Sequence, residues 1–232
     1  RTFSSAASDV YKRQPSFDSN LEKIYEDNIN ALLENENYPL ISIIMPTYNT
    51  NHDYLRECIN SVISQSYPNW ELCIADDCST DDEIRSIIER FSKEDQRIKF
   101  HFRKSNGHIS LTSNDAIKLA EGEYIALLDH DDLLHKHALF FVAKTIIENN
   151  KPNLIYTDED KYSVLEGRHM PHFKSDFNED LFYFSNYVSH LGVYKKSIID
   201  EIGGFRAGFE GSQDYDLALR AVSYTHLRAH ET

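Results

Sequence analysis

Apolar residues follow two alternating patterns between residues 40 and 156. Short apolar runs, typical of buried strands, alternate with segments in which apolar residues recur every three or four positions, as on one face of a helix. The runs lie at Leu40–Met45, Trp70–Ala75, Ile98–Phe102, Tyr124–Leu128 and Leu154–Tyr156. Because strands that alternate with helices form parallel sheets covered on both faces, we predict an α/β fold. It is expected to be a single domain on a mostly parallel central sheet.

Several residues predict where these elements begin and end. Pro46 should end the first strand, since proline cannot donate to a sheet ladder. Thr80, with Glu83 three residues later, has the spacing of a capping box at a helix start. A further helix is expected around Ser113–Ala120, and Asp132 is expected to cap the helix after the fourth strand.

The two ends of the chain differ from its middle. Residues 1–14 and 223–232 lack the apolar pattern and resemble translated sequencing-adapter sequence, so we expect both to be non-native. Residues 15–38 predict an N-terminal helical extension packed outside the sheet. Residues 39–222 would then form the main domain, which we expect to be truncated at its C-terminal end.

Composition narrows the classes of protein that are possible. The chain has 232 residues, of which 41% are hydrophobic, enough for one substantial core. Its formal net charge of −14 argues against a nucleic-acid or anionic-membrane surface. The three cysteines have no metal-type spacing and indicate reduced thiols. No apolar run has the length of a membrane span, and the first residues lack the apolar centre of a signal peptide.

Three aspartates, Asp129, Asp131 and Asp132, follow the fourth apolar run. Carboxylates this close together repel unless a cation or a proton offsets their charge. Two of them at positions i and i+2 after a strand suit Mg²⁺ or Mn²⁺, which takes one or two protein carboxylates and leaves room for phosphates. We therefore predict a metal site at Asp129 and Asp131; solvated carboxylates are the alternative. The histidines between residues 130 and 137 lack the spacing of a closed zinc site.

Polar clusters also follow the other predicted strands. The carboxyl ends of parallel strands meet at one edge of a sheet, where ligands bind, so these side chains should line one cleft. A carboxylate at such an end can accept a hydrogen bond from a pyrimidine or guanine base, although helix-start charges, caps and turns are the alternatives. The candidate residues are Pro46, Thr47, Tyr48, Asn49, Asp76, Asp77, Asn106, Gly107 and Asn114.

Asp214 follows a glycine-rich loop and precedes a helical pattern. A carboxylate at that position can act as a general base on an acceptor hydroxyl. Its alternative role is a helix N-cap.

Four motifs, in this order, resemble the inverting glycosyltransferases of family 2, which have the GT-A fold. The motifs are ISIIMPTYN, SVISQSYPNWELCIADDCSTD, NGHISLTSNDAIKLAEGEYIALLDHDDLL and FEGSQDYDLALR, and the resemblance runs from about Leu40 to Val222. It implies that Pro46 to Asn49 line the nucleotide and that Asp77 binds the base. It also implies that Asp129 and Asp131 form the metal motif, with Asp131 the direct ligand, and that Asp214 is the catalytic base. Gln213 departs from the glutamate that often precedes that base.

The resemblance implies an inverting transfer of sugar from a nucleoside-diphosphate sugar, of UDP or dTDP type, to a glycan or lipid-linked hydroxyl. The cofactor would be Mn²⁺ or Mg²⁺, and no nucleic acid would take part. The stretches IYTDEDK and SNYVSHLGVY resemble large bacterial enzymes that build O-antigen or capsule. A cytoplasmic location is implied, with any contact to the inner face of the membrane made through parts beyond this chain. Because the domain is expected to be truncated, we expect weak or absent activity.

Three other functions are alternatives to sugar transfer. A sugar-nucleotide nucleotidyltransferase would be expected to have a glycine-rich basic loop after its first strand, and Pro46 to Asn51 contains no Gly, Lys or Arg. A metal-dependent phosphohydrolase built on His130 and Asp131 lacks further histidine ligands at suitable strand ends. A non-catalytic scaffold that binds nucleotide sugars remains open, as does the oligomeric state.

Overall fold

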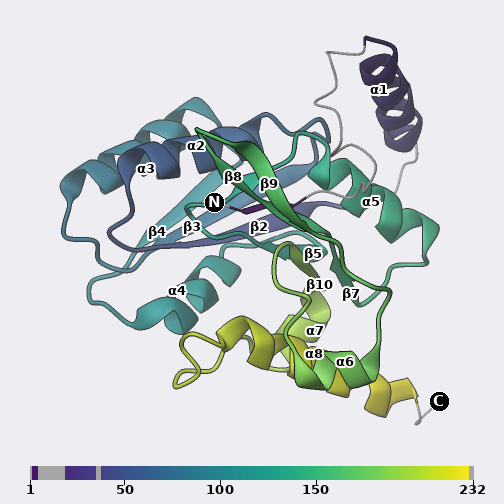
Figure 1. Ribbon diagram of the computed structural model, residues 1–232. Helices are drawn as coiled ribbons and strands as arrows, with labels where there is room; N and C mark the ends of the chain where they lie inside the picture. Colours follow the sequence, from purple (N-terminus) through teal and green to yellow (C-terminus); the bar gives the residue numbers. More distant parts are fainter. Residues whose placement is uncertain (1, 5–18, 35–37, 230–232) are drawn as a thin grey trace.

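The computed structural model describes residues 2–4, 19–34 and 38–229 (Figure 1). The strands are β1 Thr2–Ser4, β2 Ile41–Thr47, β3 Trp70–Asp76, β4 Ile98–Phe102, β5 Tyr124–Leu127, β6 Leu133–Leu134, β7 Leu154–Tyr156, β8 Glu159–Ser163, β9 Gly167–His172 and β10 Gly192–Lys195. The helices are α1 Ser19–Leu33, α2 His52–Ile63, α3 Asp82–Glu94, α4 His108–Ile117, α5 Ala138–Glu148, α6 Glu179–Phe184, α7 Lys196–Glu201 and α8 Gln213–Ala229.

The central sheet has six strands in the order β4-β3-β2-β5-β10-β7. The first four are parallel, whereas β10 runs antiparallel to both of its neighbours. The predicted α/β fold with a mostly parallel sheet is therefore confirmed, and all five predicted strands are present. β10 was not predicted. A second sheet, in the order β6-β1-β8-β9, lies beside the central one.

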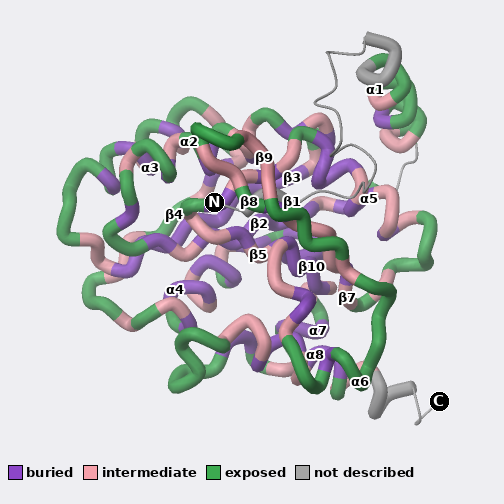
Figure 2. Tube along the Cα trace, in the orientation of Figure 1, coloured by how far each residue is buried: buried purple, intermediate pink, exposed green. Residues whose placement is uncertain are grey.

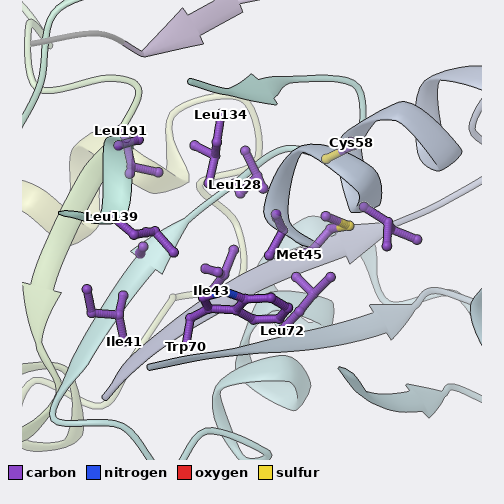
Figure 3. Packing of buried hydrophobic residues seen from close by; sticks show 14 of the residues in the cluster. Ile41, Ile43, Met45, Cys58, Trp70, Leu72, Leu128, Leu134, Leu139 and Leu191 are labelled. Carbon is purple, nitrogen blue, oxygen red and sulfur yellow. The ribbon is translucent and has the colours of Figure 1, made fainter. Parts of the chain in front are cut away.

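Alternate residues of the buried strands face two separate apolar clusters. Ile43 and Met45 of β2 pack with residues of α2, α3 and α5, whereas Ile44 packs with residues of α4, α6, α7 and α8. Figure 1 shows the two groups of helices on opposite faces of the sheet, and Figure 2 shows that the buried residues concentrate between them. Figure 3 shows Met45 close to Cys58 of α2, with Trp70 beside Ile43. Because successive side chains of a strand point to opposite faces of the sheet, each strand contributes residues to both clusters.

The sequence predicted that Pro46 ends the first strand. Pro46 instead lies inside β2, which continues to Thr47. Asp77 N donates to Thr47 O on the β3 side of β2, and Leu128 N donates to Ile44 O on the β5 side. Because alternate residues of a parallel strand face the same neighbour, the backbone of Pro46 faces the β5 side. Pairing with β5 has already ended at Ile44. The missing N–H of Pro46 therefore lies where pairing with β5 ends, a position at which a strand tolerates proline.

Two helices begin at residues that differ from the prediction. The N-cap of α3 is Asp81, not Thr80, because the extended backbone at Asp81 lets its carboxylate accept from Glu83 N at 2.9 Å. Helix α4 begins at His108, five residues before the predicted Ser113, directly after its N-cap Gly107. The apolar pattern located both helices, but it did not locate their first turns.

The predicted helical extension is present as α1, of which Ile29 packs against the main core. Parts of both stretches that are expected to be non-native belong to described elements. Thr2–Ser4 pairs with β6 and β8, and α8 continues past residue 223 to Ala229. The other residues of 1–14 and 223–232 lie outside the described part of the chain. Among the described helices, none has the length and apolar character needed to cross a membrane.

A buried ionic network joins β2, β3, β4 and the turn before β5. The carboxylate of Glu71 accepts from Ser42 Oγ at 2.6 Å and from Glu121 N at 2.6 Å, and lies 2.7 Å from Lys99 Nζ. Burial raises the pKa of Glu71, but the hydrogen bonds from Lys99, Ser42 and the Glu121 N–H outweigh burial and hold that pKa below its ordinary value. The ionised carboxylate thus stabilises the parallel half of the sheet.

Replacing Glu71 by Gln should lower the free energy of unfolding at pH 7 by about 2–4 kcal/mol, because it breaks a buried pair. Since the folded pKa of Glu71 is lowered, this contribution is present above the unfolded pKa of about 4.3 and disappears as pH falls through the folded value. Urea unfolding at pH 7 and at lower pH measures both effects. Glu121→Gln is the control, because that side chain pairs with the same lysine but is 76% exposed. Equal losses in the two variants would contradict the role of Glu71.

Candidate functional site: a two-part cleft at the carboxyl edge of the sheet

Two adjoining hollows lie where the parallel strands end. The larger hollow, of about 450 Å³, is bordered by residues that follow β2, β3, β4 and β5. The smaller hollow, of about 220 Å³, lies toward the first turn of α8. Pro46, Ile109 and Asp129 border both hollows. The predicted convergence of strand ends therefore produces one cleft with two parts.

Seven of the predicted site residues line the larger hollow, and Asp214 lines the smaller one. The seven are Pro46, Thr47, Tyr48, Asp77, Asn106, Asp129 and Asp131. Four others line neither hollow. These four are Asn49, Asp76, Gly107 and Asn114, and each instead forms a hydrogen bond to a residue or loop that borders a hollow.

Asn49 and Asp76 lock the loops after β2 and β3 together. Asn49 has a left-handed backbone (φ 44°), which asparagine tolerates, and its side-chain oxygen accepts from Thr80 N at 2.9 Å. Ser79 donates both its backbone N–H and its hydroxyl to Asp76, and it accepts from Asn49 N at 2.9 Å. Ser79 and Thr80, which the sequence predicted at a helix start, thus connect the loops after β2 and β3.

Asp77 is almost fully buried, yet it borders the larger hollow. Its Oδ1 accepts from Gly107 N at 2.8 Å and lies 3.0 Å from Arg103 Nε. Arg103 also pairs with Asp115, so it stands between two carboxylates. A Cβ at position 107 would collide with the Arg103 guanidinium. Gly107 therefore leaves room for that guanidinium beside Asp77.

Asn106 and Asn114 have opposite roles, although the sequence predicted one role for both. Asn106 borders the larger hollow. The side chain of Asn114 instead forms two hydrogen bonds of 2.8 Å with the backbone of Phe205, one to its carbonyl and one from its N–H. These bonds give Asn114 a structural role, and it borders neither hollow. Its binding of nucleotide sugar stays a prediction.

The aspartates after β5 differ in how far they are buried. Asp131 is exposed and faces the larger hollow, whereas Asp132 is buried. Asp132 does not cap a helix as predicted, because α5 begins only at Ala138, after the N-cap His137. Its Oδ2 lies 3.6 Å from His190 Nδ1, and Asp129 Oδ2 lies 3.9 Å from His190 Nε2. Ligand atoms of Asp129, Asp132 and His190 fall within 4.8 Å of one another.

Asp129 is half-buried where the two hollows meet. Burial raises the pKa of the Asp129 carboxyl. The nearby ring of His190 lowers this pKa, whereas the carboxylates of Asp131 and Asp214 raise it. The carboxylate therefore stands at the centre of a region where negative charge is crowded. A cation near it would relieve that crowding.

Asp214 lies in the first turn of α8 and faces the smaller hollow. Its Oδ2 accepts from Asn186 Nδ2 at 2.7 Å. Ser189 and His190, from the same segment as Asn186, border the same hollow. The sequence pattern does not predict a role for Asn186 or His190. The available signal was the pair of polar dipeptides, Ser185-Asn186 and Ser189-His190, before the short apolar run of β10.

The order of the sheet and the cleft at its carboxyl edge define the class: a glycosyltransferase domain of the GT-A fold. Residues 42–203 match the family described as "Glycosyl transferase family 2". The chain therefore belongs to glycosyltransferase family 2, as its motifs indicated.

Two relatives and one solved structure show how far the similarity extends. The chain is 51% identical over 189 residues to the uncharacterized protein y4gI of Sinorhizobium fredii, covering 81% of this chain and 21% of that protein. It is 34% identical to the O-antigen biosynthesis protein RfbC of Myxococcus xanthus, covering 84% of this chain and 15% of that protein. The chain thus spans a minor part of both relatives.

The solved structure is that of S. aureus TarS in complex with UDP. It has 27% sequence identity and a TM-score of 0.64, and the match covers 78% of this chain and 54% of that one.

The opposite roles of the two asparagines predict opposite effects of their removal. Asn114→Ala should lower the free energy of unfolding by about 1–3 kcal/mol, because it leaves the Phe205 backbone groups unpaired, without changing nucleotide affinity. Asn106→Ala should weaken binding of UDP, the nucleotide expected from the sequence, by about 3–10-fold with a smaller loss of stability. Calorimetric titration and urea unfolding of both variants measure this. A loss of UDP affinity in Asn114→Ala alone would support the original assignment.

Proposed function

We propose that residues 39–222 transfer a sugar, with inversion, from a nucleoside-diphosphate sugar to a hydroxyl acceptor. One observation carries the proposal. Asp129 borders both the larger hollow, which is lined by the nucleotide motif, and the smaller hollow, which contains Asp214. A donor that spans the two parts would have its nucleotide in the first and its sugar near a carboxylate in the second.

The larger hollow suits a nucleotide of UDP or dTDP type. The buried hydroxyl of Thr47 has no hydrogen-bond partner among the described residues and borders the hollow. Such a group is costly unless a ligand satisfies it. Asp77 stands beside it at the end of β3, and its carboxylate can accept from a base N–H. The complex of the similar TarS structure with UDP supports this choice of nucleotide.

The charge of the larger hollow fits a divalent cation. Asp77, Asp129, Asp131 and Glu210 border it, and its described lining contains no lysine or arginine. A diphosphate placed among four carboxylates would be repelled. Asp129 and Asp131 would hold Mn²⁺ or Mg²⁺, because both are oxygen ligands and Asp131 is exposed on the diphosphate side. When bound, the metal would offset charge on the leaving diphosphate.

Asp214 is the residue proposed to move a proton. Its carboxylate accepts the proton of the acceptor hydroxyl as the hydroxyl oxygen forms a bond to the anomeric carbon. The bond from that carbon to the diphosphate oxygen breaks on the opposite face, so the configuration is inverted. The bonding electrons leave with the nucleoside diphosphate.

The similarity to an O-antigen biosynthesis protein supports a role in bacterial surface polysaccharide synthesis. The acceptor would be a glycan or lipid-linked hydroxyl, reached from the cytoplasmic side. A position near the inner face of the membrane would follow from such an acceptor.

Asp214→Asn should lower the rate of sugar transfer by about 10²–10⁴-fold, because the amide cannot accept the hydroxyl proton. Affinity for UDP should stay within about twofold, since position 214 does not border the larger hollow. Product analysis with a panel of nucleotide sugars and Mn²⁺ measures the rate. Release of pyrophosphate by the unchanged chain would instead indicate a nucleotidyltransferase, and an unaffected rate in the variant would remove Asp214 from its role.

Asp131→Asn should lower the affinity for Mn²⁺ at least tenfold and remove the dependence of UDP binding on Mn²⁺, because it deletes the exposed carboxylate ligand. The readouts are Mn²⁺ titration by electron paramagnetic resonance and thermal shift with UDP. Asp53→Asn, an exposed aspartate in the first turn of α2, is the control. If Asp131→Asn kept its affinity while His190→Ala lost it, the ion would sit on the Asp129, Asp132 and His190 group instead.

A further inference from the structure

The segment from Asn186 to His190 connects α6 to β10 and touches the cleft at two points. Asn186 Nδ2 donates to Asp214 Oδ2 at 2.7 Å, and the ring of His190 faces Asp129 and Asp132. One short piece of chain thus contacts the carboxylate proposed as base and the carboxylates proposed to face the cation. Nothing in the family motif before Asp214 predicts such a contact.

The orientation of the Asn186 amide is fixed by a second hydrogen bond. Ser189 N lies 3.4 Å from Asn186 Oδ1 and donates to it, within the same segment. Because a backbone N–H can only donate, the oxygen of the amide must face Ser189 and the NH₂ group must face Asp214. The donor role of Asn186 toward Asp214 therefore follows from its surroundings.

A lysine with a buried side chain holds the backbone of this segment. The side chain of Lys174 is 1% exposed, and its ammonium donates to the carbonyls of Val188 at 2.8 Å and of His190 at 2.7 Å. Glu159 pairs with Lys174 and accepts from His190 N at 3.1 Å. A buried ammonium is costly unless it is paired and hydrogen-bonded, and these contacts satisfy it. The backbone around Asn186 thus has little freedom to move.

The helix that carries Asp214 is tied to the same region. The hydroxyl of Tyr215, next to Asp214 in α8, donates to the carbonyl of Phe182 in α6, two residues before the helix ends at Phe184. Phe182 is fully buried, so α6 is anchored in the core. The helix that carries Asp214 is therefore joined to α6, the helix that directly precedes the segment of Asn186.

We propose that Asn186 is a positioning residue for the base. It holds Oδ2 of Asp214, so that Oδ1, which has no hydrogen bond to another described residue, is the oxygen that takes the acceptor proton. This inference rests on the proposed function of Asp214. Preorganisation of this kind acts on the chemical step and leaves nucleotide binding unchanged.

Asn186→Ala and Asn186→Leu test the proposal. The leucine keeps nearly the same shape but removes the donor without adding charge, so it serves if the alanine variant folds poorly. We expect each to lower kcat by about 10–100-fold, with the KM for the nucleotide sugar and the Kd for UDP within about twofold. The donor is the nucleotide sugar that the panel selects, and release of nucleoside diphosphate is the rate measured.

Asn178→Ala is the matched control for a loss of stability. Asn178 caps α6, where its side chain accepts from Leu181 N at 2.9 Å, and it does not border either hollow. We expect this variant to lose stability as Asn186→Ala does but to keep kcat. An equal loss of kcat in both variants would overturn the positioning role.

A double-mutant comparison separates this inference from the proposed function. If Asn186 acts through Asp214, adding Asn186→Ala to Asp214→Asn should cause no further loss of rate. Losses that multiply would show that Asn186 acts independently, and an unchanged kcat in both Asn186 variants would also overturn the inference. A normal rate in Asp214→Asn would instead overturn the proposed base.

Discussion

The arrangement of this cleft depends on how acidic side chains are held close together. Asp77, Asp129, Asp131, Glu210 and Asp214 all border one of two connected hollows, and carboxylates this close would repel one another unless each had a partner. The chain supplies different partners to two of these carboxylates. Backbone N–H and a guanidinium approach Asp77, and an amide approaches Asp214. The exposed carboxylate of Asp131 faces the larger hollow and is left for a cation, so the proposed metal and the diphosphate would bind together.

The parallel half of the fold could be predicted because its physical causes are local. Strands such as β5 are apolar over their length, helices such as α3 have one apolar face, and strand ends must meet at one edge. Such patterns do not say which polar side chain completes which hydrogen bond. Ser79 and Thr80 have the composition of a cap but bind Asp76 and Asn49. Likewise, Asn114 is 91 residues from Phe205, the backbone that it holds, so no spacing could reveal its role.

The half of the chain after β7 was not predictable for a related reason. β10 has four residues and is inserted antiparallel between β5 and β7, so it breaks the alternation on which the prediction depended. The segment before it owes its position to Lys174, a residue whose type is usually exposed but which here is buried by contacts with two carbonyls. A sequence pattern assigns lysine to the surface. Consequently Asn186 and His190, which reach the cleft through this segment, were missed.

Asp129 links the two parts of the cleft both in space and in charge. It borders both hollows, His190 lies on one side of it, and Asp131 and Asp214 raise its pKa from the others. A cation that offsets the charge of Asp129 and Asp131 would therefore act where the two hollows meet. A donor whose diphosphate binds that cation would have its sugar directed toward the smaller hollow, which Asp214 borders. The same interaction that relieves the crowding of carboxylates would thus also place the anomeric carbon within reach of the proposed base.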